Sequence, residues 1–233
     1  RKPPDQEAKK AIDNLINLGC TLQETREILT HEIDWRIKCG ARIIVSTPRE
    51  DIGASMLIAE DLSPKVDVPV EVVPMEELEK VLSNSSNGTI VTSRYFLQPL
   101  EKVAKQHGVR AIAVDLSDFQ KELKILKELS AGSCVGIVSI SPGLLRAAEV
   151  IIHSMRGSDL MLMTAISDNN SRLLSLLKTS NHIVCDWPSL SVVENTLLKN
   201  RSQLIRLPQI ICAKNYLSIE TINQLKKEIG VIN

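Results

Sequence analysis

Apolar residues follow a helical period through the first part of the chain, residues 5–38. Ala8, Ala11, Ile12, Leu15 and Leu18 recur at steps of three and four residues. This spacing places them on one face of a helix, with the polar residues between them on the other face. The pattern therefore predicts an amphipathic helix over this stretch.

A second helix is predicted to begin at Thr21. Thr21 and Glu24 have the spacing of a capping box, in which each side chain binds a backbone N–H of the other residue. Beyond it we expect an apolar face turned inward, made of Ile28, Leu29, Ile33 and Ile37. The outward face carries Arg26, Glu27, Glu32 and Arg36. The two helices form either an ordinary hairpin or an element that couples an upstream part of the protein to the body that follows.

Beyond residue 40, short and solidly apolar runs alternate with helical segments. The runs predict strands at residues 41–45, 68–73, 89–92, 109–114, 134–139, 160–164, 182–185, 204–207 and 210–212. Strands that are apolar on both sides, each followed by a helix, form parallel sheets with helices on both faces. The fold class is therefore α/β.

Three parts are expected along the chain. Residues 1–40 form a linker and helical hairpin, residues 41–116 a first α/β lobe, and residues 117–233 a second. A helix over residues 117–129 opens the second lobe. We expect two Rossmann-like lobes with parallel sheets, arranged as in periplasmic binding proteins. One doubly wound sheet is the alternative, because no internal repeat is strong enough to decide.

The composition of the chain limits the kinds of partner and ligand that we expect. The 233 residues carry 28 Lys plus Arg and 28 Asp plus Glu. A net charge of zero gives no case for nucleic-acid binding by this chain alone. The five cysteines are odd in number and widely spaced, which disfavours a zinc site and suits a reducing cytoplasm. No apolar run is long enough to cross a bilayer.

Polar residues gather at the predicted carboxyl ends of the strands, where open parallel sheets bind ligands. The candidate ligand-binding residues are Ser46, Thr47, Arg49, Thr92, Ser93, Arg94, Ser139, Ser141 and Asp186. Several of them lead into helix N-termini, whose free N–H groups favour anions, so a carboxylate or phosphate ligand between the lobes is one interpretation. The other is that these residues only cap helices.

Signatures of common enzyme classes are absent. The sequence has no P-loop, no GxGxxG after the first strand and no GxSxG elbow. We therefore expect no catalytic residues, no metal site, no cofactor and no enzymatic activity.

Four stretches of the chain resemble one family of regulators. They are residues 8–25 (AKKAIDNLINLGCTLQET), 89–96 (TIVTSRYF), 135–143 (VGIVSISPG) and 180–186 (SNHIVCD). Their order over the full length is similar to that of GntR-family transcriptional regulators of the YhcF-like branch. In that family the first stretch follows a winged-helix DNA-binding domain.

This resemblance implies a homodimer that presents two DNA-binding heads. It also implies a link to nitrogen signalling through the small coregulator PipX and, through it, a PII-type signalling protein. The winged helix is not in this sequence, so we expect the chain alone not to bind an operator. Three functions stay open: a dimerisation and partner-docking body, a domain that senses an anionic metabolite, and an enzyme on an α/β scaffold.

Overall fold

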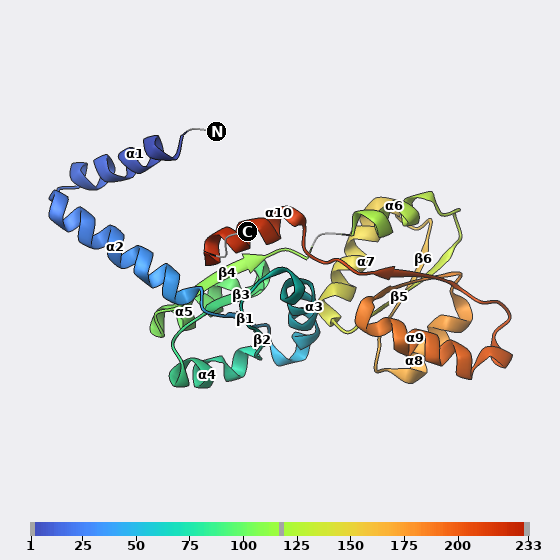
Figure 1. Cartoon of the computed structure of the whole chain (residues 1–233). Coiled ribbons are helices and arrows are strands. Elements are labelled where there is room, and N and C mark those ends of the chain that lie inside the picture. Colours follow the sequence, from blue (N-terminus) through green and yellow to red (C-terminus); the bar gives the residue numbers. More distant parts are fainter. Residues whose placement is uncertain (1–2, 117–118, 231–233) are drawn as a thin grey trace.

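The computed structural model describes residues 3–116 and 119–230, and over these residues the chain forms two α/β lobes (Figure 1). The first sheet has the order β2-β1-β3-β4 and the second has the order β6-β5-β7-β8, and all neighbours are parallel. The strands are β1 (Ile43–Val45), β2 (Val70–Val72), β3 (Thr89–Ser93), β4 (Arg110–Val114), β5 (Cys134–Ser139), β6 (Met161–Ile166), β7 (His182–Asp186) and β8 (Gln209–Ala213). The predicted α/β class with two parallel sheets is confirmed, and the single-sheet alternative is wrong.

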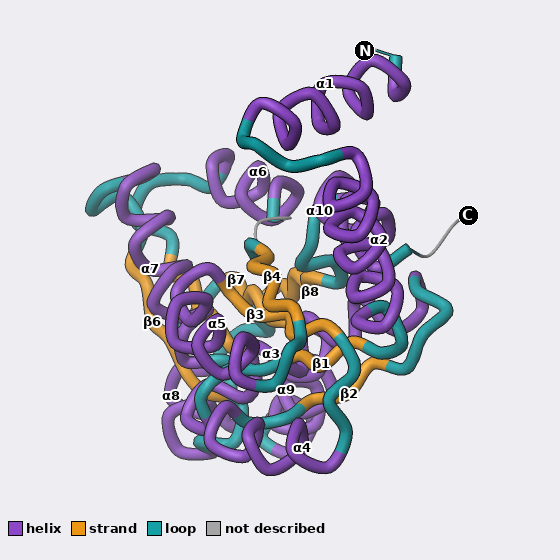
Figure 2. The backbone as a smooth tube through the Cα atoms, turned by 90° about the vertical axis from the view of Figure 1, so that its left-hand side faces the viewer, coloured by secondary structure: helices purple, strands orange, loops and turns teal. Residues whose placement is uncertain are grey.

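Helices cover both faces of each sheet, so the strands run through the middle of the molecule (Figure 2). The first lobe contains α3 (Ile52–Leu62), α4 (Leu78–Asn84) and α5 (Leu97–Gln106). The second contains α6 (Gln120–Glu128), α7 (Pro142–Arg156), α8 (Asn170–Thr179) and α9 (Trp187–Lys199). In β1, Ile43 and Val45 pack on one side and Ile44 on the other, and all three are fully buried. Burial on both faces explains why the strands appear in the sequence as unbroken apolar runs.

Over the described residues, five single turns of 3₁₀ helix lead into or follow these helices. They are η1 (Arg49–Asp51), η2 (Ser63–Lys65), η3 (Met75–Glu77), η4 (Arg94–Phe96) and η5 (Arg201–Gln203). The strand predicted at residues 204–207 is wrong. This segment follows η5 without joining the sheet, and Ile205 is wholly exposed. The predicted helix over residues 117–129 is α6, and its first two residues lie outside the described part of the chain.

The two lobes exchange one helix each. After β4 the chain crosses to the second lobe, where α6 packs Leu126 against β5 and α7. After β8 it crosses back, and α10 (Ile219–Ile229) packs Ile222 and Leu225 against α3 and the first sheet (Figure 1). The predicted division assigned residues 117–233 to the second lobe, but the last helix of that range lies in the core of the first.

The helical hairpin projects from the first lobe (Figures 1 and 2). It consists of α1 (Pro4–Asn17), which has no buried residue, and α2 (Leu22–Cys39). The capping box of Thr21 and Glu24 is present as predicted. The inward face predicted for α2 is wrong for three of its four members, because Ile28, Ile33 and Ile37 are exposed. The body of the chain does not reach them.

Where the chain is described, α2 contacts the body through its last turns. Trp35 donates its indole N–H to the Gly108 carbonyl at 2.6 Å, and the Thr89 hydroxyl donates to the Cys39 carbonyl at 2.9 Å. At Gly40 a Cβ would come within 2.2 Å of the Ile229 carbonyl oxygen at the end of α10. The hairpin is thus anchored against β3, the start of β4 and α10.

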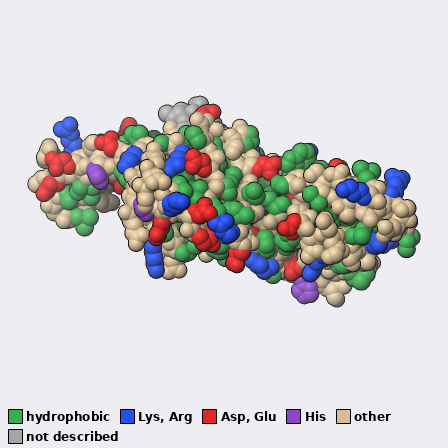
Figure 3. All heavy atoms as spheres, turned by 90° about the horizontal axis from the view of Figure 1, so that it is seen from below, with side chains coloured by type: hydrophobic (Ala, Val, Ile, Leu, Met, Phe, Trp, Pro, Cys, Tyr) green, Lys and Arg blue, Asp and Glu red, His purple; other side chains and the backbone are tan. Residues whose placement is uncertain are grey.

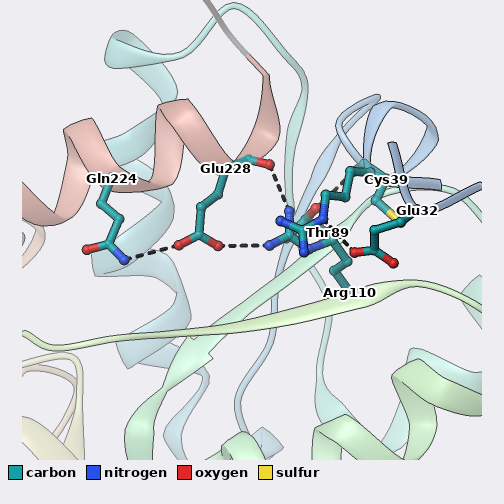
Figure 4. Close-up of polar contacts among 7 residues, drawn as sticks. Glu32, Cys39, Thr89, Arg110, Gln224 and Glu228 are labelled. Atoms are coloured by element: carbon teal, nitrogen blue, oxygen red, sulfur yellow. Dashed lines mark hydrogen bonds and ion pairs between the residues drawn. The ribbon is translucent and has the colours of Figure 1, made fainter. Parts of the chain in front are cut away.

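An ion pair reinforces this anchor (Figure 4). Arg110 at the start of β4 donates to the Glu228 carbonyl at 2.8 Å and to its carboxylate at 2.9 Å. The Arg110 side chain is largely buried, so these bonds lie in a less polar environment than a surface pair. They hold α10 against the edge of the first sheet.

Candidate functional site

The two lobes meet at a small polar contact, which we call the interlobe seam and define by Asp51, Gly53, Ile140, Ser141 and Gly143. The carboxylate of Asp51, at the end of η1, accepts the Ser141 hydroxyl at 2.7 Å and the Gly143 backbone N–H at 3.2 Å. Asp51 and Ser141 are both buried. A carboxylate of the first lobe therefore occupies the N-terminus of α7 in the second, where the helix favours negative charge.

Two glycines make this close approach possible. A Cβ on Gly53 would lie 2.1 Å from the Ile140 carbonyl oxygen, and a Cβ on Gly143 would lie 2.2 Å from an Asp51 carboxylate oxygen. Both distances are far below van der Waals contact. Any larger residue at either position has to separate the lobes or displace Asp51.

Two more buried carboxylates hold backbone amides near the crossings. Asp186 accepts the Ile140 and Ser189 N–H groups, each at 2.9 Å, and so caps α9. Asp61 of α3 accepts the N–H groups of Tyr216 and Leu217, at 2.9 and 2.8 Å. Each carboxylate connects parts of the chain that are distant in sequence.

Tyr216 ties the second crossing to the second lobe. Its hydroxyl accepts the Trp187 backbone N–H at 2.8 Å and donates to the Ala213 carbonyl at 3.1 Å. Burial raises the pKa of this phenol above its ordinary value, although the bond from Trp187 acts in the opposite direction. The phenol therefore keeps its proton at neutral pH and can donate to Ala213.

The predicted site residues of the first lobe lie at the carboxyl ends of β1 and β3. Ser46, Thr47 and Thr92 are fully buried. The Thr47 hydroxyl donates to the Asp51 carbonyl and also shares a hydrogen bond with the Ser55 hydroxyl, both at 2.8 Å. The hydroxyls of Ser46, Thr92 and Ser93 are buried without a partner in the described part of the chain. The ends of β1 and β3 therefore hold polar groups that are not all used for capping.

The two predicted arginines are exposed and face carboxylates of the same chain. Arg94 binds Asp115, with Nε donating at 3.1 Å, and this hydrogen bond raises the pKa of the guanidinium. Arg49 pairs with Glu77, and its backbone N–H lies 3.1 Å from both carboxylate oxygens of Glu76. Both arginines therefore already have an anionic partner.

The predicted site residues of the second lobe lie together at the carboxyl ends of β5 and β7, where α7 and α9 begin. Ser139 ends β5, Ser141 caps α7, and Asp186 caps α9. The Ser139 hydroxyl accepts the Ser141 backbone N–H at 3.0 Å. The structure brings Ser141 into contact with Asp51 of the first lobe, a residue that the sequence analysis did not single out. Asp51 stands in an ordinary polar run before a helix, so nothing in its local sequence marks it.

Surface charge and clusters of metal ligands are the remaining features that could mark a functional site. On the face seen in Figure 3, acidic and basic side chains are interspersed and form no patch of a single sign. Among the described residues, no group of three or more His, Cys, Asp or Glu side chains is placed to hold a metal ion. No helix over these residues is both long and apolar enough to span a membrane.

A family model matches the second lobe of this chain. Residues 121–214 match the family model of the C-terminal domain of cyanobacterial PlmA-type GntR regulators. The matched range runs from α6 to the end of β8. Over residues 121–214, the resemblance to GntR regulators inferred from the sequence is thereby confirmed, and the regulators indicated are of the PlmA type.

Other comparisons add little. No curated protein matches the chain. A solved complex of VinN with L-aspartate aligns at 12% identity over 89% of this chain and 67% of that one, with a TM-score of 0.31. The C-terminal domain of glucosamine-fructose-6-phosphate aminotransferase from Francisella tularensis aligns at 11% identity over 95% and 90%, with a TM-score of 0.30. Similarities this low carry no argument about function.

Proposed function

We propose that this chain, which contains the C-terminal domain of a PlmA-type GntR regulator, is the dimerisation and partner-docking body of that regulator. The observation that carries the proposal is the helical hairpin. It stands away from the first lobe and leaves an apolar stripe uncovered. In the family that the sequence resembles, this hairpin follows the DNA-binding domain.

The stripe suits a second copy of this chain. Leu22, Leu29, Ile33 and Ile37 follow one another at seven- and four-residue steps and so lie along one side of α2. Leu22, Ile33 and Ile37 are 71%, 55% and 69% exposed. A two-fold interface pairs the same surface on both subunits, and the mixed charges of α2 give no like-charge barrier to that pairing.

Sedimentation velocity tests this arrangement. Ile33→Glu and Ile37→Glu place a charge in the stripe, and we expect either change to shift the protein from dimer to monomer at micromolar concentration. Leu198→Glu is the matched control, because Leu198 is equally exposed but lies on α9 in the second lobe. A wild-type protein that sediments only as a monomer would contradict the proposal.

We propose further that the α/β body docks PipX and, through it, a PII-type signalling protein, in the cytoplasm. The support is the PlmA-type family match. Titration of labelled PipX against this chain should give saturable binding that persists in Ile33→Glu if docking uses the body. Binding that requires the intact hairpin would place the docking surface elsewhere.

A second candidate function, sensing of an anionic metabolite, is favoured by one observation. The α7 N-terminus already holds a carboxylate, that of Asp51. A free carboxylate or phosphate could displace it and separate the lobes, and the candidate ligand-binding residues are then Ser46, Thr47, Arg49, Thr92, Ser93, Arg94, Ser139, Ser141 and Asp186. Succinate and inorganic phosphate are suitable probes. Thermal stabilisation that is lost in Ser141→Ala would support this function.

We also propose that the chain has no enzymatic activity. The proposal follows from the absence of a P-loop, a dinucleotide fingerprint and a nucleophile elbow in its sequence. A reproducible turnover that disappears in Ser141→Ala or Asp186→Asn would refute it.

A further inference from the structure

The second lobe contains a pocket that none of the functions above uses. Its walls are α6 and α7, its floor is the carboxyl ends of β5 and β7, and its volume is about 90 Å³ (Figure 1 shows α6 and α7). Leu116, in the crossing after β4, and Ala213, at the end of β8 where the second crossing begins, line it as well. The pocket therefore lies where the chain passes from one lobe to the other.

Apolar side chains make up most of the lining. They are Leu123, Leu126, Ala147, Ala148, Ile151 and Ile152. The alanines of α7 leave room that larger residues would fill. In the first lobe the corresponding space between α3 and α10 is taken by a buried cluster that includes Leu62, Leu217 and Leu225.

One end of the pocket is polar. Ser139 and Asp186 line it, and both are buried. The Asp186 carboxylate accepts two backbone N–H groups, and its four lone-pair positions leave capacity for a further donor. The Ser139 hydroxyl accepts one N–H and keeps a proton to donate.

This arrangement selects one kind of ligand. A hydroxyl group can accept from Ser139 and donate to Asp186 at the same time. Asp186 and Glu122 both line the pocket and would repel an anion. Apolar cavities of about 150 Å³ take up benzene. This space of about 90 Å³ is smaller but opens between two helices, so a single ring can enter it partly, with its polar end inside.

We propose that this pocket binds a small, neutral, apolar molecule with one hydroxyl group, such as a phenol. The pocket is also connected to the first lobe through a contact between two aromatic side chains. Phe119 of its lining contacts the Tyr216 ring edge-on, with centroids 6.3 Å apart. Tyr216 leads into α10, whose far end holds the hairpin, so an occupant that moves Phe119 acts on the base of α10. This proposal stands independently of dimerisation and PipX docking.

Methyl NMR with phenol as the probe tests the proposal on the whole chain. We expect saturable shifts of the Ala147, Ala148 and Ile151 methyl signals, with intermolecular NOEs from phenol to Ala148 and Ile152. Ala147→Leu and Ala148→Leu fill the space and should weaken phenol binding about tenfold or more. Val150→Leu is the matched control, since Val150 is an exposed residue of the same helix, and it should bind like the wild type.

Two further probes test the polar end. Toluene has the ring without the hydroxyl, and benzoate has an anion in its place. Ser139→Ala should weaken phenol binding and leave toluene binding unchanged, and benzoate should not bind at this position. The proposal is overturned if phenol gives no saturable shift, if its NOEs fall outside the pocket, or if benzoate binds there as tightly as phenol. The NOEs locate the probe in the wild type, so the test does not depend on the variants folding.

Discussion

Asp51 is a first-lobe residue whose carboxylate serves the second lobe. It accepts the Ser141 hydroxyl and the Gly143 N–H, and no other described contact joins a side chain of η1 to α7 so directly. A buried carboxylate in this position satisfies two donors at once. These two bonds therefore help to fix the orientation of the two lobes.

Asp51→Ala should lower the free energy of unfolding by about 1–3 kcal/mol, because it leaves the buried Ser141 hydroxyl and the Gly143 N–H without their acceptor. Asp51→Asn should cost less, since its side-chain oxygen still accepts. Glu50→Ala is the control, as Glu50 is the exposed neighbour. Urea unfolding measures the difference, and equal midpoints for Asp51→Ala and Glu50→Ala would contradict the role given to Asp51.

Gly53→Ala is a second test at the scale of a residue. Within a helix this change ordinarily stabilises by about 1 kcal/mol. Here the new Cβ would meet the Ile140 carbonyl, so we expect destabilisation of about 1–3 kcal/mol instead. Small-angle scattering should also show a larger radius of gyration. A stabilised variant with unchanged dimensions would mean that the interlobe seam is looser than the structure shows.

At the scale of elements, α2 is fixed at its two ends by different means. The capping box of Thr21 and Glu24 closes its start, and Trp35 and Gly40 anchor its end against the first lobe. Between them the helix crosses solvent. A helix held in this way can pass a rigid displacement from α10 to whatever precedes the hairpin.

Thr21→Ala should cost roughly 1 kcal/mol through the lost cap. Trp35→Ala should cost more, roughly 3 kcal/mol, because Trp35 packs against the first lobe and donates to Gly108. In a full-length regulator we expect Thr21→Ala to leave partner docking intact and to weaken its coupling to operator affinity, since a frayed first turn absorbs displacement. The coupling is measured as the change in operator affinity when the docking partner is titrated into the regulator. An unchanged coupling free energy in a measurably frayed variant would make the hairpin a simple tether.

The start of α2 should also depend on pH. The Glu24 carboxylate accepts the Thr21 backbone N–H at 2.7 Å and the Thr21 hydroxyl at 2.8 Å, and these bonds lower its pKa below the ordinary value of 4.5. The capping contribution is therefore fully present above pH 4.5 and is lost as the pH falls through the lowered pKa. The Thr21 amide, whose acceptor is the Glu24 carboxylate, should lose its protection there, so that its hydrogen exchange approaches the intrinsic rate. Glu24→Gln should remove this pH dependence, and a wild-type profile that matches the variant would refute it.

At the scale of the whole molecule, the sequence predicts the helices and strands well. It predicts less well which of them pack against one another. Unbroken runs such as Ile43–Val45 and caps such as Thr21 and Ser141 are local signals, and they placed most strands and helices correctly. The period of α2 identifies an apolar face, but it cannot say whether this chain or another covers it. For the same reason the sequence assigned α10 to the wrong lobe. The candidate site residues lie at strand ends as predicted, but their binding of a ligand stays a prediction.

The exchange of helices predicts an asymmetry between the lobes. A fragment of residues 119–213 contains every helix that covers the second sheet and should fold alone. A fragment of residues 41–116 lacks α10 and should not, unless a peptide of residues 214–230 is added. Circular dichroism and amide NMR distinguish these outcomes. A well-folded 41–116 fragment without the peptide would show that α10 is dispensable for that core.

The return of α10 has a consequence for how the protein is made. A chain leaves the ribosome N-terminus first, and the helix that completes the first lobe emerges only after all strands of the second lobe. About 115 residues separate the end of β4 from the end of α10, which at about 5–20 residues per second is roughly 6–23 s of synthesis. During that interval the second lobe can close while one face of the first sheet stays open to water. The lobe made first is therefore finished last, and it is the part of the nascent chain most exposed to chaperones and to aggregation.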